Sequence, residues 1–355
     1  MKRAIGPVLF LLVIVMMAFA CAEEAETFTS GDYTYTLNED GSAVISKYSG
    51  RDRELTIPSE LDGHPVKGIG GEAFFDCNSL TSITLPDSVT DLGANPWVYC
   101  NSLNTISVSP GHPALAVIDS ALYSKADKKL VWVPMSTEGT FEIPQGIRII
   151  GDMAFYYCES LTSVTIPDSV TTIGDWAFSS CKSLTSVTIP VSVTAIGECV
   201  FAVCESLTSV TIPDSVTAIG NSAFSGCFSL TSVTIPDSVT VIGNGAFSFC
   251  HSLTSVTIPV SVTAIGNWAF SGCFSLTSVT IPDSVTAIGN WAFYSCESLT
   301  SVTIPDSVTS IGSEAFSYCN SLSMIIVTEG SFAEQYCIDN NLPYQYTNYL
   351  DWLND

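Results

Sequence analysis

The chain has 355 residues, of which 46% are hydrophobic and only 13% are charged, and its formal net charge is −24. Residues 183–355 contain thirteen Asp and Glu but no Lys or Arg, so this half of the chain cannot neutralise phosphates. Nucleic acids and anionic lipid headgroups are therefore poor candidates for partners. The apolar content predicts a substantial buried core.

The N-terminus has the features of an export signal. Lys2 and Arg3 precede an apolar run at 8–19 that is too short to span a membrane comfortably. We expect residues 1–20 to be a signal peptide, and two kinds of processing fit its end. One is ordinary cleavage at a small-residue motif, and the other is lipidation of Cys21, which resembles the modified cysteine of a bacterial lipoprotein. The chain is accordingly expected to be secreted or held at the cell surface, with a lipid on Cys21 as its one means of membrane attachment.

Residues 21–54 are predicted to form a linker and a β-hairpin that caps the following array. The segment 33–54 alternates polar and apolar residues around the letters NEDG at 38–41, which is a hairpin signal.

Residues 55–327 repeat one phrase with a period of 23 residues. The period is marked by cysteines at 77 and 100, and then at 158, 181, 204, 227, 250, 273, 296 and 319. Between Cys100 and Cys158 the step is 35 residues longer, which predicts an irregular insertion at about 109–142 with a hairpin candidate at 121–134. A period of this length predicts a solenoid, in which each coil buries its apolar side only against its neighbours.

The coil that begins at Cys204 reads CESLTSVTIPDSVTAIGNSAFSG. Its Leu207, Val210 and Ile212 have the L-x-x-L-x-L spacing of a leucine-rich-repeat strand, with apolar residues pointing inward and the intervening Ser and Thr outward. Proline then ends the strand, a second short extended piece ends at a glycine bend, and the spacing Ala-Phe-x-x-Cys predicts a short helical turn. Phe recurs at this place in nearly every coil, so stacked coils should form a continuous column of Phe rings.

These features predict an α/β solenoid, a leucine-rich-repeat array with a parallel β-sheet face and short extended and helical turns on its other sides. Residues 328–355 are predicted to form a C-terminal cap, because the phrase decays after Cys319. Within them, the segment 330–346 indicates a short helix and a last strand.

The consensus L-x-x-V-x-I-P-x-x-V-x-x-I-G-x-x-A-F-x-x-C, which covers about Thr56 to Val327, resembles the treponemal-type repeats of BspA-like bacterial surface proteins. The resemblance implies a surface or secreted protein. Some characterised members of that family are adhesins that bind host matrix or other bacteria.

The cysteines and histidines show no pattern of catalysis or metal binding. Stacked ladder cysteines would have parallel side-chain directions that suit a disulfide badly, so we predict small buried apolar groups. Cys199 and Cys337 stand off the ladder and are the plausible bridging or reactive thiols. His64, His112 and His251 lie in dissimilar contexts, and the chain has no C-x-x-C motif or Cys/His cluster. We therefore expect no enzyme, no metal and no cofactor.

Aromatic residues at positions where most coils carry a small or polar residue are the candidate binding residues. Trp176, Trp268 and Trp291 stand two places before the repeated Phe, and Phe228 and Phe274 directly follow the repeated Cys. Three of them, Trp268, Phe274 and Trp291, belong to consecutive coils and could form one exposed patch for a protein or a sugar. The alternative is that they pack over the turns between coils.

The sequence therefore indicates a non-enzymatic, adhesin-like interaction protein that binds a protein or glycan on a host or neighbouring cell surface through multivalent contacts. One alternative is a passive structural or antigenic spacer. A more distant one is an ice-binding protein that uses the outward Ser-x-Thr letters.

Overall fold

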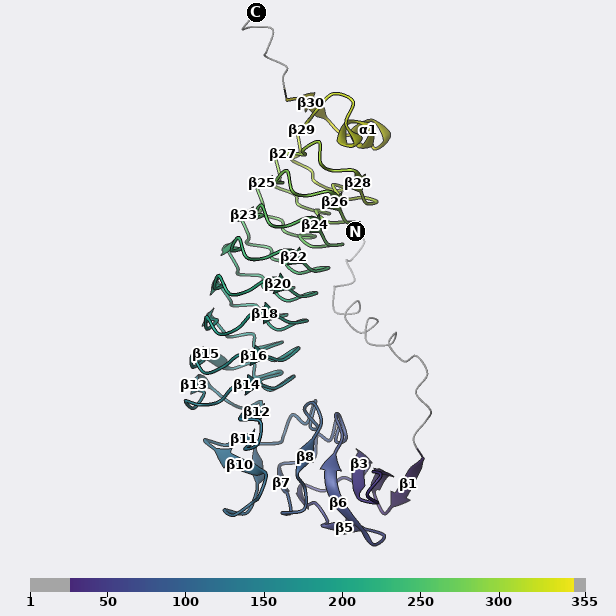
Figure 1. Cartoon of the computed structure of the whole chain (residues 1–355), viewed down its shortest axis with the longest axis vertical. Coiled ribbons are helices and arrows are strands. Elements are labelled where there is room, and N and C mark those ends of the chain that lie inside the picture. Colours follow the sequence, from purple (N-terminus) through teal and green to yellow (C-terminus); the bar gives the residue numbers. More distant parts are fainter. Residues whose placement is uncertain (1–25, 348–355) are drawn as a thin grey trace, which may run out of the picture.

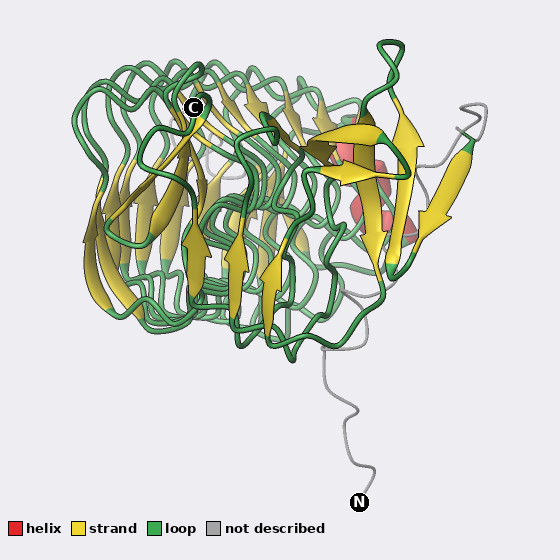
Figure 2. Cartoon of the chain, turned by 90° about the horizontal axis from the view of Figure 1, so that it is seen from below, coloured by secondary structure: helices red, strands yellow, loops and turns green. Residues whose placement is uncertain are grey.

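The structure is a computed structural model that describes residues 26–347. It is a β-solenoid of about 13 turns with little helix (Figure 1). Successive coils stack along the long axis of the molecule, and their strands lie one behind another in a view from below (Figure 2). The signal peptide expected at 1–20, Cys21 and the last eight residues of the predicted C-terminal cap lie outside the described residues.

The N-terminal segment contains an antiparallel hairpin, as the alternation at 33–54 indicates, with one further strand before it. In the order β1-β2-β3, neighbouring strands pair antiparallel, and β3 then pairs parallel with β6. Strand β6 also pairs with β5 and β8, so the hairpin sheet continues into the coils. The bounds are β1 (Thr27–Ser30), β2 (Tyr33–Leu37), β3 (Ala43–Tyr48), β5 (Glu60–Leu61), β6 (His64–Ile69) and β8 (Asp91–Leu92).

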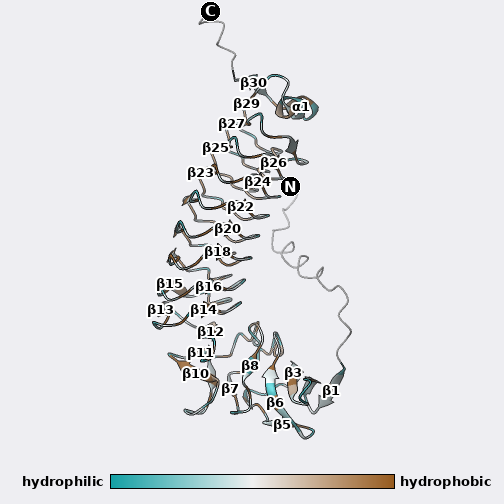
Figure 3. Cartoon of the chain, viewed as in Figure 1, coloured by the Kyte–Doolittle hydropathy of each residue, from teal (hydrophilic) through white to brown (hydrophobic). Residues whose placement is uncertain are grey.

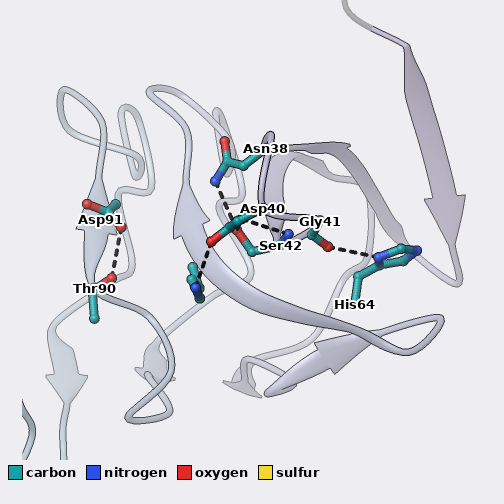
Figure 4. A network of polar contacts seen from close by, with 8 residues as sticks. Asn38, Asp40, Gly41, Ser42, His64, Thr90 and Asp91 are labelled. Atoms are coloured by element: carbon teal, nitrogen blue, oxygen red, sulfur yellow. Dashed lines mark hydrogen bonds and ion pairs between the residues drawn. The ribbon is translucent and has the colours of Figure 1, made fainter.

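Polar contacts hold the tip of the β2–β3 hairpin against β6 (Figure 4). The carboxylate of Asp40 accepts hydrogen bonds from the backbone N–H of Ser42 at 3.0 Å and from its hydroxyl at 2.6 Å, and it pairs with Lys67 at 2.8 Å. A ring nitrogen of His64 lies 2.9 Å from the carbonyl oxygen of Gly41. The Lys67 ammonium and the Ser42 donors hold the pKa of Asp40 well below its usual range. The turn is thus tied to the following strand, which fixes the cap on the array.

The first coils precede the insertion and already show parallel pairing. Strands β4 (Glu54–Thr56), β7 (Ser82–Thr84) and β9 (Thr105–Ser107) pair in that order. Ile83 faces Ile106 at the regular period of the repeat, whereas Leu55 faces Ile83 across a longer step. The extra residues of the first coil form β5 and its turn onto β6.

The insertion forms an antiparallel meander that rejoins the array. Strands β10 (Leu115–Ile118), β11 (Ala121–Ser124) and β12 (Lys129–Trp132) pair antiparallel in that order, and β12 then pairs parallel with β14 (Ile149–Ile150). The buried indoles of Trp97 and Trp132 meet edge to face there, 6.1 Å between ring centroids. Because Trp132 belongs to the hydrophobic core of the first coils and its neighbour Val133 to that of the later ones, the insertion joins the two cores.

The regular array has two rows of parallel strands. In the first row Ser232, Val233 and Thr234 face Ser255, Val256 and Thr257, so each residue meets its own counterpart in the next coil. The central Val of each strand is buried between residues that are mostly exposed, as the sequence predicts. Figure 3 shows hydrophobic and hydrophilic residues mixed within each coil, which matches this alternation.

The first-row strands share the outward Ser-x-Thr pattern or its variants: β13 (Gly139–Glu142), β15 (Leu161–Thr165), β17 (Ser186–Thr188), β19 (Ser209–Thr211), β21 (Ser232–Thr234), β23 (Ser255–Thr257), β25 (Ser278–Thr280), β27 (Ser301–Thr303) and β29 (Met324–Val327). The second-row strands are two residues long: β14 as above, β16 (Thr172–Ile173), β18 (Ala195–Ile196), β20 (Ala218–Ile219), β22 (Val241–Ile242), β24 (Ala264–Ile265), β26 (Ala287–Ile288) and β28 (Ser310–Ile311).

The helical turns predicted for the third side of each coil do not form. In the coil of Phe224, Ser222 and Gly226 adopt left-handed conformations, with φ of 52° and 73°. The N–H groups of Ser222, Phe224 and Gly226 donate to carbonyl oxygens of the next coil, each at 2.8 Å, rather than to carbonyl oxygens four residues earlier. The left-handed residues break a right-handed helical path, so this side is a run of turns linked from coil to coil.

The predicted column of Phe rings runs through the core. From Phe155 to Phe316 each ring stacks on the next, with centroids 4.8–5.5 Å apart and planes within 15° of parallel. All these rings are buried, because each coil contributes one ring at the same point of its path.

The array ends in a short helix and a strand, as the segment 330–346 indicates. Helix α1 (Phe332–Asp339) begins after Ser331, whose hydroxyl accepts from the N–H of Glu334. Strand β30 (Tyr344–Tyr346) then pairs parallel with β29. These two elements cover the last coil, whose strand edge would otherwise be open to pairing with another chain.

Candidate binding surface

Two columns of aromatic side chains project from the turn side of the coils. Trp268 and Trp291 occupy the same left-handed position in consecutive coils, with φ of 54° and 53°. Their indoles stack with centroids 5.0 Å apart and planes 3° from parallel. Trp268 is 44% exposed, and Trp291 is half-buried.

The second column includes a histidine for which sequence reasoning had found no role. Phe228, His251 and Phe274 follow the ladder cysteine in three consecutive coils, and the imidazole lies between the two phenyl rings at 4.6 and 4.5 Å. Burial lowers the pKa of His251, which favours the neutral ring. These three residues are separated by the repeat period, and that spacing in the sequence could have predicted that their rings stack.

The predicted patch of Trp268, Phe274 and Trp291 is thus divided between two columns. Within the described residues, Trp268 stacks on Trp291 and Phe274 stacks on His251, and no ring contact joins Trp268 to Phe274. Each column combines the two roles considered from sequence, since the rings pack on one another between coils and remain partly exposed. Phe274 is 38% exposed and Phe228 is half-buried.

Trp176 lies apart from these columns, near the insertion. Its indole is half-buried and edge-on to Tyr156, 6.4 Å between centroids. Tyr156 belongs to a cluster in which its hydroxyl lies 2.9 Å from that of Tyr99, and Tyr157 packs on both. Sequence reasoning did not identify this cluster, because Tyr99 joins it from the other side of the insertion.

The hydroxyl groups of the strand face have two different roles. The Thr that precedes each strand donates to the carbonyl of its counterpart one coil earlier, as Thr208 does to Thr185 at 3.1 Å. The Ser and Thr within the strand, such as Ser255 and Thr257, are exposed. The outward hydroxyl array predicted from sequence therefore presents its Ser-x-Thr letters to solvent, while the Thr before them joins the coils.

The ladder cysteines are free thiols with a structural role. From Cys181 to Cys319 each Sγ–H donates to the carbonyl oxygen of the Phe in the preceding coil, at 3.1–3.3 Å. Burial raises the pKa of Cys227 and of Cys273 to about 12. Such thiols are almost wholly protonated at neutral pH and poor nucleophiles.

Cys199 and Cys337 do not have the properties predicted for bridging or reactive thiols. Both are free and buried. Burial raises the pKa of Cys199 to about 12 and that of Cys337 to about 11. The prediction rested on their position off the ladder, but that position does not expose them.

The rest of the described chain offers little for small-molecule chemistry. Residues 26–347 contain no cluster of three His, Cys, Asp or Glu side chains suited to a metal ion. Two open hollows near the N-terminus share the lining residues Tyr48, Phe75 and Asp76 and lie away from the aromatic columns. No described helix is both long enough and apolar enough to cross a bilayer.

The coil geometry and the repeat define a leucine-rich-repeat β-solenoid. A family model for the BspA type leucine rich repeat region, in six copies, matches residues 52–130, 136–253 and 217–345. The chain belongs to this BspA type leucine-rich-repeat family.

Solved structures of similar proteins agree with this assignment. A leucine rich cell surface protein from Faecalibacterium prausnitzii A2-165 is 30% identical, with 89% of this chain and 98% of that one covered and a TM-score of 0.51. A leucine-rich repeat protein from Eubacterium ventriosum ATCC 27560 has the same fold at 22% identity, with 76% and 94% covered and a TM-score of 0.59. A comparison with curated proteins gave no match.

Proposed function

We propose that this protein is an exported, non-enzymatic, adhesin-like protein of the cell surface that binds a protein or glycan partner through repeated contacts. The observation that carries the proposal is the pair of aromatic columns on the turn side, formed by residues that depart from an otherwise uniform repeat. Large exposed aromatic side chains cost solubility and commonly mark contact sites.

The location is supported by the export signal predicted at the N-terminus and by the similarity to the Faecalibacterium protein, which is a leucine rich cell surface protein. A rigid array offers the same weak contact many times, so affinity accumulates through avidity. The absence of Lys and Arg from residues 183–355 argues for a neutral or basic partner.

The aromatic columns, rather than the strand hydroxyls, are proposed as the main contacts. Truncation of a desolvated aromatic residue at the centre of an interface commonly costs about 2 kcal/mol or more. An exposed hydroxyl exchanges a bond to water for a bond to the partner and nets roughly 0.5–1.5 kcal/mol.

The test is to probe protein and glycan arrays with the purified chain, and then to compare three variants on any ligand found. Trp268→Ala and Trp291→Ala should weaken binding more than Thr257→Ala, while circular dichroism shows that all three remain folded. If the chain binds nothing on either array, the proposal is contradicted and a passive spacer is favoured. A larger loss for Thr257→Ala would move the contact to the strand face.

A further inference from the structure

One face of the Trp268 indole stacks on a ring of the next coil, and the other face lies toward a coil that has a glycine at the same position. At the left-handed position two before the repeated Phe, five consecutive coils carry Ser222, Gly245, Trp268, Trp291 and Glu314. Trp291 stacks on one face of Trp268. The coil on the other side has a glycine at this position, so it provides no side chain to cover the ring.

Gly245 is itself buried, and the place that a side chain at this position would fill is bounded by hydroxyl groups. A Cβ built on Gly245 would lie 3.3 Å from the Oγ of Ser222 and 3.4 Å from that of Ser248, and no atom of Trp268 is as close. The hydroxyls of Ser225 and Ser248 lie 2.7 Å apart. A ligand group that stacked on Trp268 at this point would therefore meet hydroxyls that can both donate and accept hydrogen bonds.

An exposed amide directly precedes Gly245 in the chain. Asn244 is exposed, and its Oδ1 accepts from the backbone N–H of Asn267 at 2.8 Å. Within the described residues the Nδ2 group of Asn244 makes no hydrogen bond to the protein, so it is available as a donor.

The turn sides around this space carry no formal charge. Segments 217–229, 240–252 and 263–275 contain Asn, Ser, Thr and apolar residues and one neutral His251, but no Asp, Glu, Lys or Arg. A cationic ligand would find no carboxylate here, and an anionic one would find no cation anywhere in residues 183–355. The surroundings therefore favour an uncharged ligand.

A flat aromatic face beside hydroxyl and amide groups is the chemistry that recognises an uncharged sugar ring, whose C–H face is apolar and whose edge is polar. We infer that the open face of Trp268, above Gly245, is a subsite for one neutral hexopyranose residue of a glycan. This inference rests on the proposed binding function and specifies its ligand class.

A substitution that covers this face tests the inference without removing Trp268. Trp268 and Trp291 already adopt at this position the left-handed conformation that Gly245 has, φ 61°. Gly245→Trp should therefore be tolerated, and it extends the indole column across the open face. Glu314→Trp is the matched control, because it extends the column at its other end, beyond Trp291, and leaves the proposed subsite open.

The probes are methyl glycosides of neutral hexopyranoses, namely glucose, galactose and mannose, with methyl glucuronide as the anionic counterpart. In full-length protein labelled with ¹⁵N-tryptophan, each of the six tryptophans gives one indole N–H signal, and Trp268→Phe assigns that of Trp268. A neutral glycoside should shift the Trp268 signal saturably, and the glucuronide should shift it far less. Gly245→Trp should weaken the apparent Kd by roughly tenfold or more, whereas Glu314→Trp should leave it unchanged.

Three outcomes would overturn the inference: no saturable shift with any neutral glycoside, a saturable shift confined to other tryptophans, or undiminished binding by a folded Gly245→Trp variant. The outcome for the proposed function is separate. If the chain captures a protein on the array while no glycoside binds at Trp268, the subsite is refuted and the binding function stands.

Discussion

The glycine that follows each second-row strand lies close to the backbone of the preceding coil, and replacing it tests how the array is held together. A Cβ added to Gly266 would lie 2.7 Å from both the carbonyl carbon and the carbonyl oxygen of Gly243, and 2.9 Å from the nitrogen of Asn244. The conflict is with backbone atoms, so no side-chain rotation relieves it. The two coils would have to separate by roughly 0.7 Å to restore a contact of 3.4 Å.

That separation has a cost in free energy that can be estimated. Forced overpacking costs about 1–3 kcal/mol. Moving the coils apart also stretches the hydrogen bond from the N–H of Asn267 to Asn244, 2.8 Å long, and such bonds contribute about 1 kcal/mol each. Gly266→Ala should therefore lower the free energy of unfolding by about 2–4 kcal/mol.

The assay is urea unfolding followed by circular dichroism, with Gly111→Ala as the control. Gly111 lies on an exposed turn of the insertion, and a Cβ there would meet no atom within 4 Å. The control shares the stiffening of the unfolded chain by Ala, so the difference between the variants reports the clash. If Gly266→Ala unfolds within about 0.5 kcal/mol of Gly111→Ala at an equal denaturant slope, the reasoning is refuted.

Three further predictions concern the core, the thiols and the C-terminal cap. Phe247→Ala, which removes a buried ring stacked on both sides, should cost about 3–5 kcal/mol in the same unfolding assay, and a cost under about 1 kcal/mol would show that the column is not a core. Native alkylation followed by mass spectrometry should modify Cys319 before the buried ladder thiols, because it is half-buried and the neighbouring Cys296 thiol lowers its pKa. Cys273 should react only after denaturation and as a free thiol, and a disulfide at either position would contradict this. In the cap, hydrogen bonds from Tyr346 and from the backbone of Gly330 lower the pKa of Glu334. The stabilisation that these bonds give is therefore complete above the ordinary carboxyl pKa and is lost as the pH falls through the lowered value. An NMR titration should show a higher Glu334 pKa in Tyr346→Phe, and an equal pKa would refute the assignment.

The strands and the Phe column could be predicted because they depend on residue type and spacing alone. Apolar letters that alternate with Ser and Thr determine which side of a strand is buried, and the constant repeat period determines which residues meet in successive coils. The register of Val233 with Val256 and the stacking of Phe224 on Phe247 follow directly from these two facts.

The turn side could not be predicted in the same way, because its backbone conformation leaves no reliable mark in the letters. Apart from Gly245, the left-handed position is filled by residues that are not typical of positive φ, such as Cys199, Ser222, Trp268 and Glu314. The spacing Ala-Phe-x-x-Cys fits one turn of helix equally well, so periodicity favoured the wrong structure there. The contact of the repeated glycine with another coil was also not predicted, since close approach between coils is a property of the stacked array and not of one repeat.

The aromatic stacking could be predicted from sequence only between residues that are separated by a whole number of repeat periods. Trp268 and Trp291 are one repeat period apart and stack, whereas Phe274 is not a whole number of periods from either and belongs to another column. The same arithmetic places His251 between Phe228 and Phe274. Residues separated by the repeat period were thus predictable neighbours. Trp268 and Phe274 occupy different positions within the coil, and no ring contact joins them in the described residues.

The left-handed position also explains where such a duplicated chain can acquire specificity. Inward positions keep the same letters because each must fit between two neighbours, and the glycine after the second strand is fixed by its contact with backbone. At the position of Trp268, by contrast, the residue ranges in size from Gly245 to Trp291, and its side chain is not needed to fill the core. Its occupants in the regular coils lack β-branching, which positive φ disfavours. Substitution there changes the surface without disturbing the stack, so recognition can diversify at this column while the fold is copied unchanged.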